Sequence, residues 1–294
     1  MRRFLGLCLL LSPAWAAGQD CTSYVVVAAY EHKLGADLDN LKADDFEASA
    51  GNSVLPVVSA RQNFSNRLLV LLETDGAAKN KKLGDMVDIA TQWARQTPEG
   101  EPVAFGIFGK RALFTKGFIA DPKERLKAIN SVIEEASSMG KDAALFDSLH
   151  QGLELFEGQE PGDTVLLISD NFDDSSRRSA SDLEKEFVSR GIRLFLILRQ
   201  NMSRVGRDFN WRPHNEGDIL ARISRETGGA FSEFSPAFFR FAWAGYLVGV
   251  RVPMDEGRRH KLKIHLKGAS EIYRRANLYY PDRLPACTPE PPAH

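Results

Sequence analysis

Four short apolar runs alternate with segments of helical spacing in the middle of this chain, and this alternation constrains the fold most strongly. The runs are LLVLL (68–72), PVAFGIF (102–108), TVLLIS (164–169) and IRLFLIL (192–198). Each is almost continuously apolar, which is typical of a strand that is buried on both faces. Strands that alternate with helices are joined by right-handed crossovers. We therefore predict an α/β domain with a mostly parallel central sheet and helices on both faces.

The segments between these runs carry apolar residues at the spacing of a helix. We expect helices over 83–96, 122–139, 143–156, 181–190 and 218–227, and a strand in ALFTKGF (112–118) that pairs with PVAFGIF. The chain is long enough for one large domain or for a medium domain with a small partner.

Both ends of the chain have a β pattern instead. Three strands are expected within 24–60, and further strands in YLVGVRVP, HKLKIHL and EIYRRANLYY, between 246 and 280. The simplest account inserts the α/β domain into a small β unit built from both chain ends. The predicted segments are a signal peptide (1–16), an N-terminal β segment (17–62), the α/β domain (63–236), a C-terminal β segment that packs with the N-terminal one (237–281) and an irregular tail (282–294).

The first residues have the pattern of a secretory signal peptide. Arg2 and Arg3 precede an apolar run over 4–11, and Ala14-Trp15-Ala16 supplies the small residues of a cleavage site. A buried N-terminal helix is the alternative. The run is too short to span a bilayer, and no later segment approaches the roughly 20 apolar residues that a span needs. We expect a mature protein that is secreted or periplasmic and has no membrane span.

Cleavage would remove Cys8 and leave Cys21 and Cys287, one near each end of the mature chain. An even pair of cysteines in an oxidising compartment favours a disulfide, which would join the two ends. The alternative is two free thiols on the terminal segments. A catalytic cysteine is disfavoured, because neither position sits beside a plausible histidine.

Charge and missing motifs exclude several function classes. Lys+Arg number 38 against Asp+Glu 39, so the composition offers no concentrated basic surface for nucleic acid or anionic lipid. The glycine-rich signatures of dinucleotide and P-loop sites are absent, as are G-x-S-x-G and H-E-x-x-H. We therefore expect no small-molecule cofactor and no catalytic residues.

Carboxylates follow two of the predicted parallel strands. LLVLL leads directly into ETDGA (73–77), TVLLIS leads into Asp170, and the loop before the helix at Ala143 contributes Asp142. Ligands of open α/β sheets bind outside the carboxyl ends of the strands, so these residues are expected to share one binding rim.

The series LLVLLETDGA, GKDAALFDSL, TVLLISDNFDD and TGGAFSEF resembles the von Willebrand factor type A (VWA) domain. The likeness spans residues 66–235 and is nearest to the secreted bacterial "VWFA-related" family, which the flanking β segments also resemble. The resemblance implies a Rossmann-like α/β domain that binds proteins, often through a metal-ion-dependent adhesion site. That site uses a D-x-S-x-S turn, a threonine and a later aspartate.

Those family positions fall on Glu73, Asp75, Ala77, Ala143 and Asp170, of which only Asp170 matches. Two hydroxyl ligands are replaced by alanines, which offer no side-chain oxygen for near-octahedral Mg²⁺. We therefore predict a non-enzymatic binding module with a degenerate adhesion site and an unidentified protein partner. A cluster of Glu73, Asp75 and Asp170 that holds Mg²⁺, Ca²⁺ or Mn²⁺ is the alternative, and a metal-dependent hydrolase is a further one.

Overall fold

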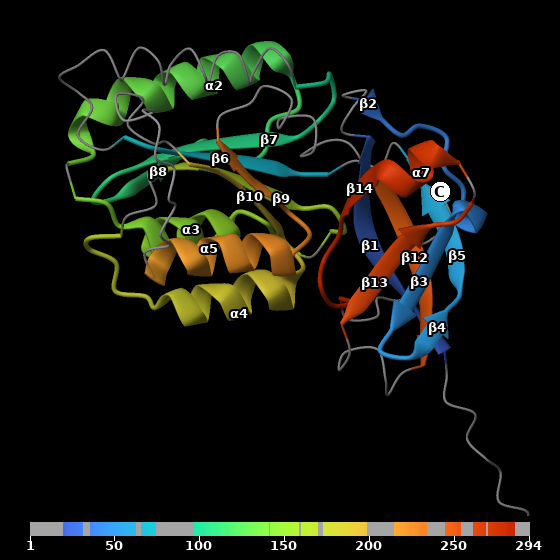
Figure 1. Ribbon diagram of the computed structural model, residues 1–294. Coiled ribbons are helices and arrows are strands. Elements are labelled where there is room, and N and C mark those ends of the chain that lie inside the picture. The colour runs from blue at the N-terminus through green and yellow to red at the C-terminus, as the bar shows by residue number, and fades with distance from the viewer. Residues whose placement is uncertain are drawn as a thin grey trace, which may run out of the picture.

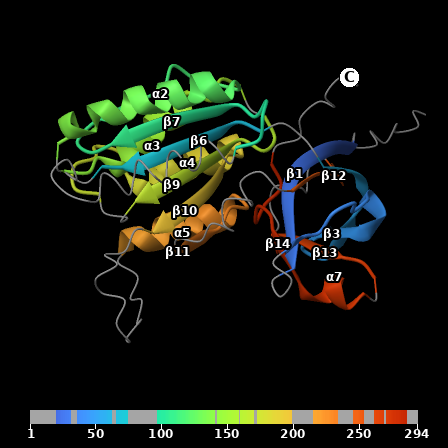
Figure 2. The same ribbon diagram turned by 90° about the horizontal axis from the view of Figure 1, so that it is seen from above.

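The computed structural model describes residues 20–31, 36–62, 66–74, 97–140, 142–158, 160–169, 173–198, 215–233, 245–253, 261–268 and 270–285. Two units lie side by side in both views of the ribbon (Figures 1 and 2). One is an α/β unit and the other is built from β-strands, with one short helix.

The α/β unit has a six-stranded sheet in the order β11-β10-β9-β6-β7-β8. The strands are β6 (Leu68–Glu73), β7 (Val103–Phe108), β8 (Ala112–Phe114), β9 (Thr164–Ser169), β10 (Arg193–Leu198) and β11 (Phe231–Glu233). All neighbours are parallel except β7 and β8, which form an antiparallel edge. Numbered along the chain, this is the Rossmann order 3-2-1-4-5-6, which places a topological switch point between β6 and β9.

Helices cover both faces of this sheet (Figure 1). Alternate residues of β6 point to opposite faces, so Leu68, Val70 and Leu72 pack on the side of α2 (Pro122–Glu134), whereas Leu69 and Leu71 pack on the side of α3 (Leu145–Glu154). The helices α4 (Ala180–Arg190) and α5 (Asn215–Glu226) share the second face with α3. Full burial of each such side chain stabilises the fold by about 1.5–3 kcal/mol.

Local signals set where these helices begin and end. Asp121 accepts hydrogen bonds from the backbone N–H groups of Lys123 and Glu124, which caps α2, and Pro122 occupies its first turn. Ser179 caps α4 in the same way. Gly191 ends α4 in the left-handed region, with φ of 63°, so the chain can turn directly into β10.

The β unit takes its strands from both ends of the chain. One sheet has the order β14-β1-β12-β5, with β2 also paired to β1, and a second has the order β13-β3-β4. The strands are β1 (Asp20–Glu31), β2 (Ala36–Asp37), β3 (Phe46–Ala50), β4 (Ser53–Leu55), β5 (Val57–Arg61), β12 (Tyr246–Pro253), β13 (Leu262–Leu266) and β14 (Ala276–Tyr279). Apolar side chains of both sheets share one core. The predicted fold class is confirmed, because the α/β unit is inserted between β5 and β12.

The structure differs from the expected elements at several places. Pro56 separates β4 from β5, which belong to different sheets, and a 3₁₀ turn, η1 (Ala43–Asp45), precedes β3. The helix predicted over 122–139 ends as α2 at Glu134 and continues as a 3₁₀ turn, η3 (Glu135–Ser138). The first half of EIYRRANLYY is not a strand but the helix α7 (Glu271–Arg275), in which Arg275 pairs with Glu271 one turn away. The helix predicted over 83–96 lies outside the described residues.

Candidate functional site

The carboxyl ends of β6 and β9 meet at the topological switch point, where the sequence places the binding rim. Glu73 is the last residue of β6, and its side-chain oxygen Oε2 accepts a 2.7 Å hydrogen bond from the Ser169 hydroxyl at the end of β9. Glu73 is only 2% exposed. The carboxylate of Glu73 is therefore enclosed between two buried strands and is not exposed on the predicted rim.

The next residue continues this closed arrangement. Thr74 is also 2% exposed, and its hydroxyl donates a 2.8 Å hydrogen bond to the carbonyl oxygen of Phe108 at the end of β7. The ends of β6, β7 and β9 are thus tied together by the side chains of Glu73 and Ser169, the last residues of their strands, and of Thr74, which follows β6.

The start of α3 is covered by residues 173–178, which we call the capping segment. Asp173 accepts a 2.8 Å hydrogen bond from the backbone N–H of Leu145, and the backbone N–H groups of Asp174 and Ser175 donate to the carbonyl oxygen of Ala143 at 2.8 and 3.1 Å. The first N–H groups of a helix have no partner within the helix, so an acceptor here stabilises the helix start. Asp173 therefore caps α3, to which it is not adjacent in the sequence.

Asp147 in the first turn of α3 binds the capping segment in return. Its carboxylate accepts hydrogen bonds from the backbone N–H groups of Arg177 and Arg178, at 3.1 and 3.0 Å, while its own N–H donates to the Ser176 hydroxyl at 3.0 Å. These reciprocal bonds fix the backbone of the capping segment against α3. The sequence reasoning missed Asp147, although an aspartate two residues into a helix is a recognisable N-terminal signal.

The predicted rim residues differ in their exposure to solvent. Ala143 is 3% exposed and its methyl group packs in the core, whereas Asp142 is exposed. Asp75, Ala77 and Asp170 lie outside the described residues. Within the described ranges, no three His, Cys, Asp or Glu side chains gather in a way that could hold a metal ion.

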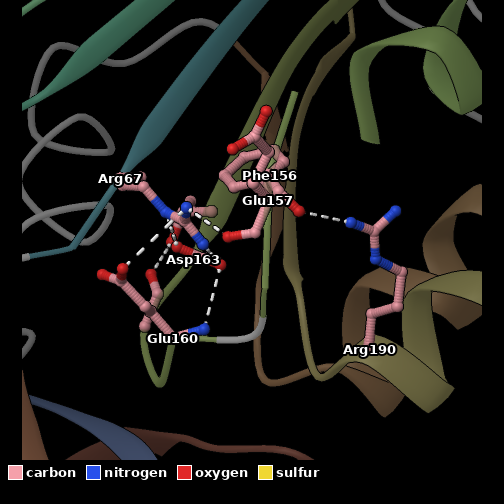
Figure 3. Close-up of polar contacts among 8 residues, drawn as sticks. Arg67, Phe156, Glu157, Glu160, Asp163 and Arg190 are labelled. Carbon is pink, nitrogen blue, oxygen red and sulfur yellow. Dashed lines mark hydrogen bonds and ion pairs between the residues drawn. The ribbon is translucent and has the colours of Figure 1, made fainter. Parts of the chain in front are cut away.

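A second polar cluster lies at the opposite, amino ends of β6 and β9 (Figure 3). Arg67 donates two hydrogen bonds to the Asp163 carboxylate, at 2.9 and 2.6 Å, and a third to the carbonyl oxygen of Glu157 at 2.9 Å. Its guanidinium lies 5.6 and 5.5 Å from the ring centres of Phe118 and Phe156, within the range of a cation–π contact.

This ion pair is largely withdrawn from water, since the side chains of Arg67 and Asp163 are 13% and 1% exposed. Burial raises the pKa of Asp163, and the hydrogen bonds from Arg67 oppose that rise. The hydrogen bond with Asp163 also raises the pKa of Arg67. Sequence reasoning missed the pair, although each residue directly precedes the first residue of a buried strand, and Leu68 pairs with Thr164 in the sheet.

No family model matches this chain, and no curated protein sequence matches it. Solved structures similar to it include a von Willebrand factor type A protein from Catenulispora acidiphila, which is 13% identical over 86% of this chain and 76% of that one, with a TM-score of 0.48. An aerotolerance-related membrane protein from Bacteroides fragilis is 14% identical over 60% of this chain and 95% of its own, with a TM-score of 0.44. The conserved hypothetical protein BatB from Bacteroides thetaiotaomicron is 13% identical over 60% and 94%, with a TM-score of 0.44.

The α/β unit is VWA-like in fold. The strand order and the two helical layers agree with the Rossmann-like architecture that the sequence resemblance implies. Of the helices that the structure describes, none is long and apolar enough to cross a membrane.

Proposed function

We propose that this chain is a non-enzymatic protein-binding module that acts outside the cytoplasm. Its VWA-like unit would bind a protein partner at the carboxyl ends of β6 and β9, through surface complementarity and without a shared metal ion. The observation that carries the proposal is that the side chains and backbone groups at this end of the sheet bond to one another. A degenerate adhesion site of this kind presents a fixed surface in place of an open coordination shell.

Two contacts support this choice over a metal-mediated site. The Glu73 carboxylate already accepts the Ser169 hydroxyl, so a metal ion at that oxygen would compete with a buried 2.7 Å hydrogen bond. At the threonine position, Ala143 offers only a methyl group, and Asp173 is engaged by the N–H of Leu145. Mg²⁺ demands near-octahedral oxygen ligands, which the described part of this rim does not supply.

The exposed side chains of the rim define what a partner would meet. Asp142 and Asp174 present carboxylates, and Arg177 and Arg178 present guanidinium groups. The backbone of Asp174, Arg177 and Arg178 is held in place by its hydrogen bonds to Ala143 and Asp147. A surface that is fixed before binding loses less conformational entropy when a partner docks. Charges of both signs favour a partner surface with a complementary pattern.

The proposal includes secretion and a disulfide between Cys21 and Cys287. A contact between residues close to the two cysteines supports the disulfide: the Ser23 hydroxyl donates a 2.9 Å hydrogen bond to the carbonyl oxygen of Pro285. Ser23 follows Cys21 by two positions and Pro285 precedes Cys287 by two, so this hydrogen bond brings the two ends of the chain together. Cys287 itself lies outside the described residues.

Partner capture from the native envelope tests the proposal. The mature protein is used as bait with and without EDTA, beside the variant Asp174→Lys and a matched control, Glu134→Lys, on the exposed side of α2. We expect one specific partner that survives EDTA and the control substitution and is lost with Asp174→Lys. Capture that disappears in EDTA would favour the metal-binding alternative with Glu73, Asp75 and Asp170, and capture that tolerates Asp174→Lys would place the interface elsewhere.

A further inference from the structure

The turn between β7 and β8, residues 109–111, adds two basic side chains to the end of the sheet where the proposed rim lies. It follows the carboxyl end of β7, which is the neighbour of β6 in the parallel part of the sheet, so the turn leaves the sheet on the same side as Glu73. Lys110 and Arg111 are both exposed. The β7–β8 turn therefore presents two cations close to the rim residues already described.

Backbone hydrogen bonds join the β7–β8 turn to residues 139–140 and 142–144, which precede α3 and which we call the central segment. The N–H of Lys110 donates to the carbonyl oxygen of Met139 at 2.9 Å, and the N–H of Ala144 donates to the carbonyl oxygen of Gly109 at 2.8 Å. The same central segment accepts two N–H groups of the capping segment, as described above. The β7–β8 turn, the central segment and the capping segment thus form one platform, with the central segment in the middle.

Two glycines let the β7–β8 turn and the central segment approach each other closely. A Cβ atom on Gly109 would lie 2.9 Å from the carbonyl oxygen of Met139, and a Cβ atom on Gly140 would lie 3.2 Å from the Cβ atom of Lys110. Gly140 also has φ of 83°, a conformation that other residues rarely adopt. The backbone of the platform is therefore fixed before a partner arrives, which reduces the entropy lost on binding.

The exposed charges of the platform follow a spatial order. Asp142 and Asp174 present carboxylates at its centre, because Asp142 precedes Ala143 and the N–H of Asp174 donates to the carbonyl oxygen of Ala143. None of the platform's exposed charged side chains forms an ion pair with a residue that the structure describes. Two pairs of cations flank this centre, namely Lys110 and Arg111 on the β7–β8 turn, and Arg177 and Arg178 on the capping segment.

The other carboxylates near the platform are engaged or lie at its borders. Asp147 and Asp173 accept backbone N–H groups at the start of α3, where the positive end of the helix dipole balances part of their charge. Glu135 is exposed on η3, which precedes the central segment, and Asp182 is exposed in the first turn of α4, which follows the capping segment. The sign of the exposed charge thus alternates across the platform, with carboxylates at the centre and cations on both sides of it.

We propose that the partner of the rim is a protein surface on which carboxylates flank a central lysine or arginine. This inference rests on the proposed function and adds the chemistry of the partner. The central basic group would meet Asp142 and Asp174, and the flanking carboxylates would meet the cations of the β7–β8 turn and of the capping segment. A uniformly acidic or uniformly basic partner would bring like charges together on part of the platform, which disfavours its binding.

Zero-length cross-linking with a carbodiimide tests this chemistry, because it joins only amines and carboxylates that are in contact. The mature protein is incubated in EDTA with the partner that it captures from the native envelope, and the joined peptides are identified by mass spectrometry. We expect Lys110 to be joined to an Asp or Glu of the partner. Capture of a partner in which Lys110 is joined to no carboxylate would overturn the inference.

Charge-reversal variants complete the experiment. Lys110→Glu with Arg111→Glu should keep the wild-type melting temperature and weaken binding of the captured partner by about ten-fold or more in calorimetric titration. The matched control, Lys123→Glu with Lys127→Glu on the exposed side of α2, changes the net charge equally and should bind like the wild type. If no partner is captured, the proposed function itself fails. If a partner is captured and lost with Asp174→Lys, but binds the variant of the β7–β8 turn with the wild-type Kd, this inference alone fails.

Discussion

Replacing Arg67 by methionine should destabilise the protein strongly, and more at neutral than at acid pH. The substitution removes the two hydrogen bonds to Asp163 and the bond to the carbonyl oxygen of Glu157, but it keeps most of the side-chain volume beside Phe118 and Phe156. It leaves the Asp163 carboxylate, which is 1% exposed, without the guanidinium group that balances its charge. Breaking a buried ion pair in this way costs about 3–5 kcal/mol, which is a large part of a typical unfolding free energy of about 5–15 kcal/mol.

The sign of the pH dependence follows from the pKa of Asp163. Burial already raises this pKa, and Arg67 opposes the rise, so its loss should raise the folded-state pKa of Asp163 further. The folded state of the variant then binds a proton at pH values where the unfolded state does not. Stability therefore decreases as pH rises from the unfolded pKa, about 3.9, through the raised folded value. The cost of Arg67→Met should be largest at pH 7 and smaller near pH 4.

Urea denaturation at both pH values measures these costs. The second variant, Arg67→Met with Asp163→Asn, removes the stranded charge and should recover much of the loss at pH 7. A cost below about 1 kcal/mol at pH 7 would refute the reasoning. An equal cost at both pH values, with no recovery in the double variant, would show that packing rather than charge decides the effect.

Three further outcomes are expected. Mg²⁺ or Ca²⁺ at millimolar concentration should leave the melting temperature unchanged, and a large shift that Asp170→Ala abolishes would contradict the metal-free site. Asp173→Ala should cost about 1 kcal/mol by uncapping α3, measured against Asp174→Ala as an exposed control in thermal melts; equal melting temperatures would contradict the capping role. Reduction with dithiothreitol should cost about 2–4 kcal/mol in urea denaturation. Cys287→Ser should lose the same amount and no longer respond to dithiothreitol, so a variant that still responds would argue against the Cys21–Cys287 disulfide.

The strands of the α/β unit could be predicted because each buried strand leaves a direct mark in the sequence. TVLLIS is a strand over the predicted residues, 164–169, since a central parallel strand must be apolar on both faces. The same rule predicts a strand over IRLFLIL (192–198), and the structure has β10 there. The secondary structure of EIYRRANLYY (271–280) was harder to predict, because its apolar residues suit either a half-buried strand or a short helix. Ser270, Glu271 and two arginines in the last turn are helix signals that decide for α7 over its first half.

The place of the predicted rim residues in the fold could be predicted, but their contacts could not. The positions after β6 and before α3 follow directly from the topology of a parallel sheet, so Glu73 and Ala143 lie at its carboxyl end. The hydrogen bond to the buried Glu73 carboxylate comes from Ser169, which is 96 residues away, and the cap on Leu145 comes from Asp173, 28 residues away. Contacts between such distant residues have no fixed spacing in the sequence.

The sequence by itself determined the alternation of strands and helices, because burial on two faces restricts which residues can stand in a central strand. It also placed alanines at positions 77 and 143, where the family resemblance leads us to expect hydroxyl-bearing residues. Only the tertiary structure decided that Glu73 is enclosed, that Arg67 and Asp163 form a pair, and that the turn with Lys110 lies beside the segment before α3. The physical reason is that the solvation and partners of a charged group depend on which strands lie side by side, and strand pairing is fixed only when the whole chain has folded.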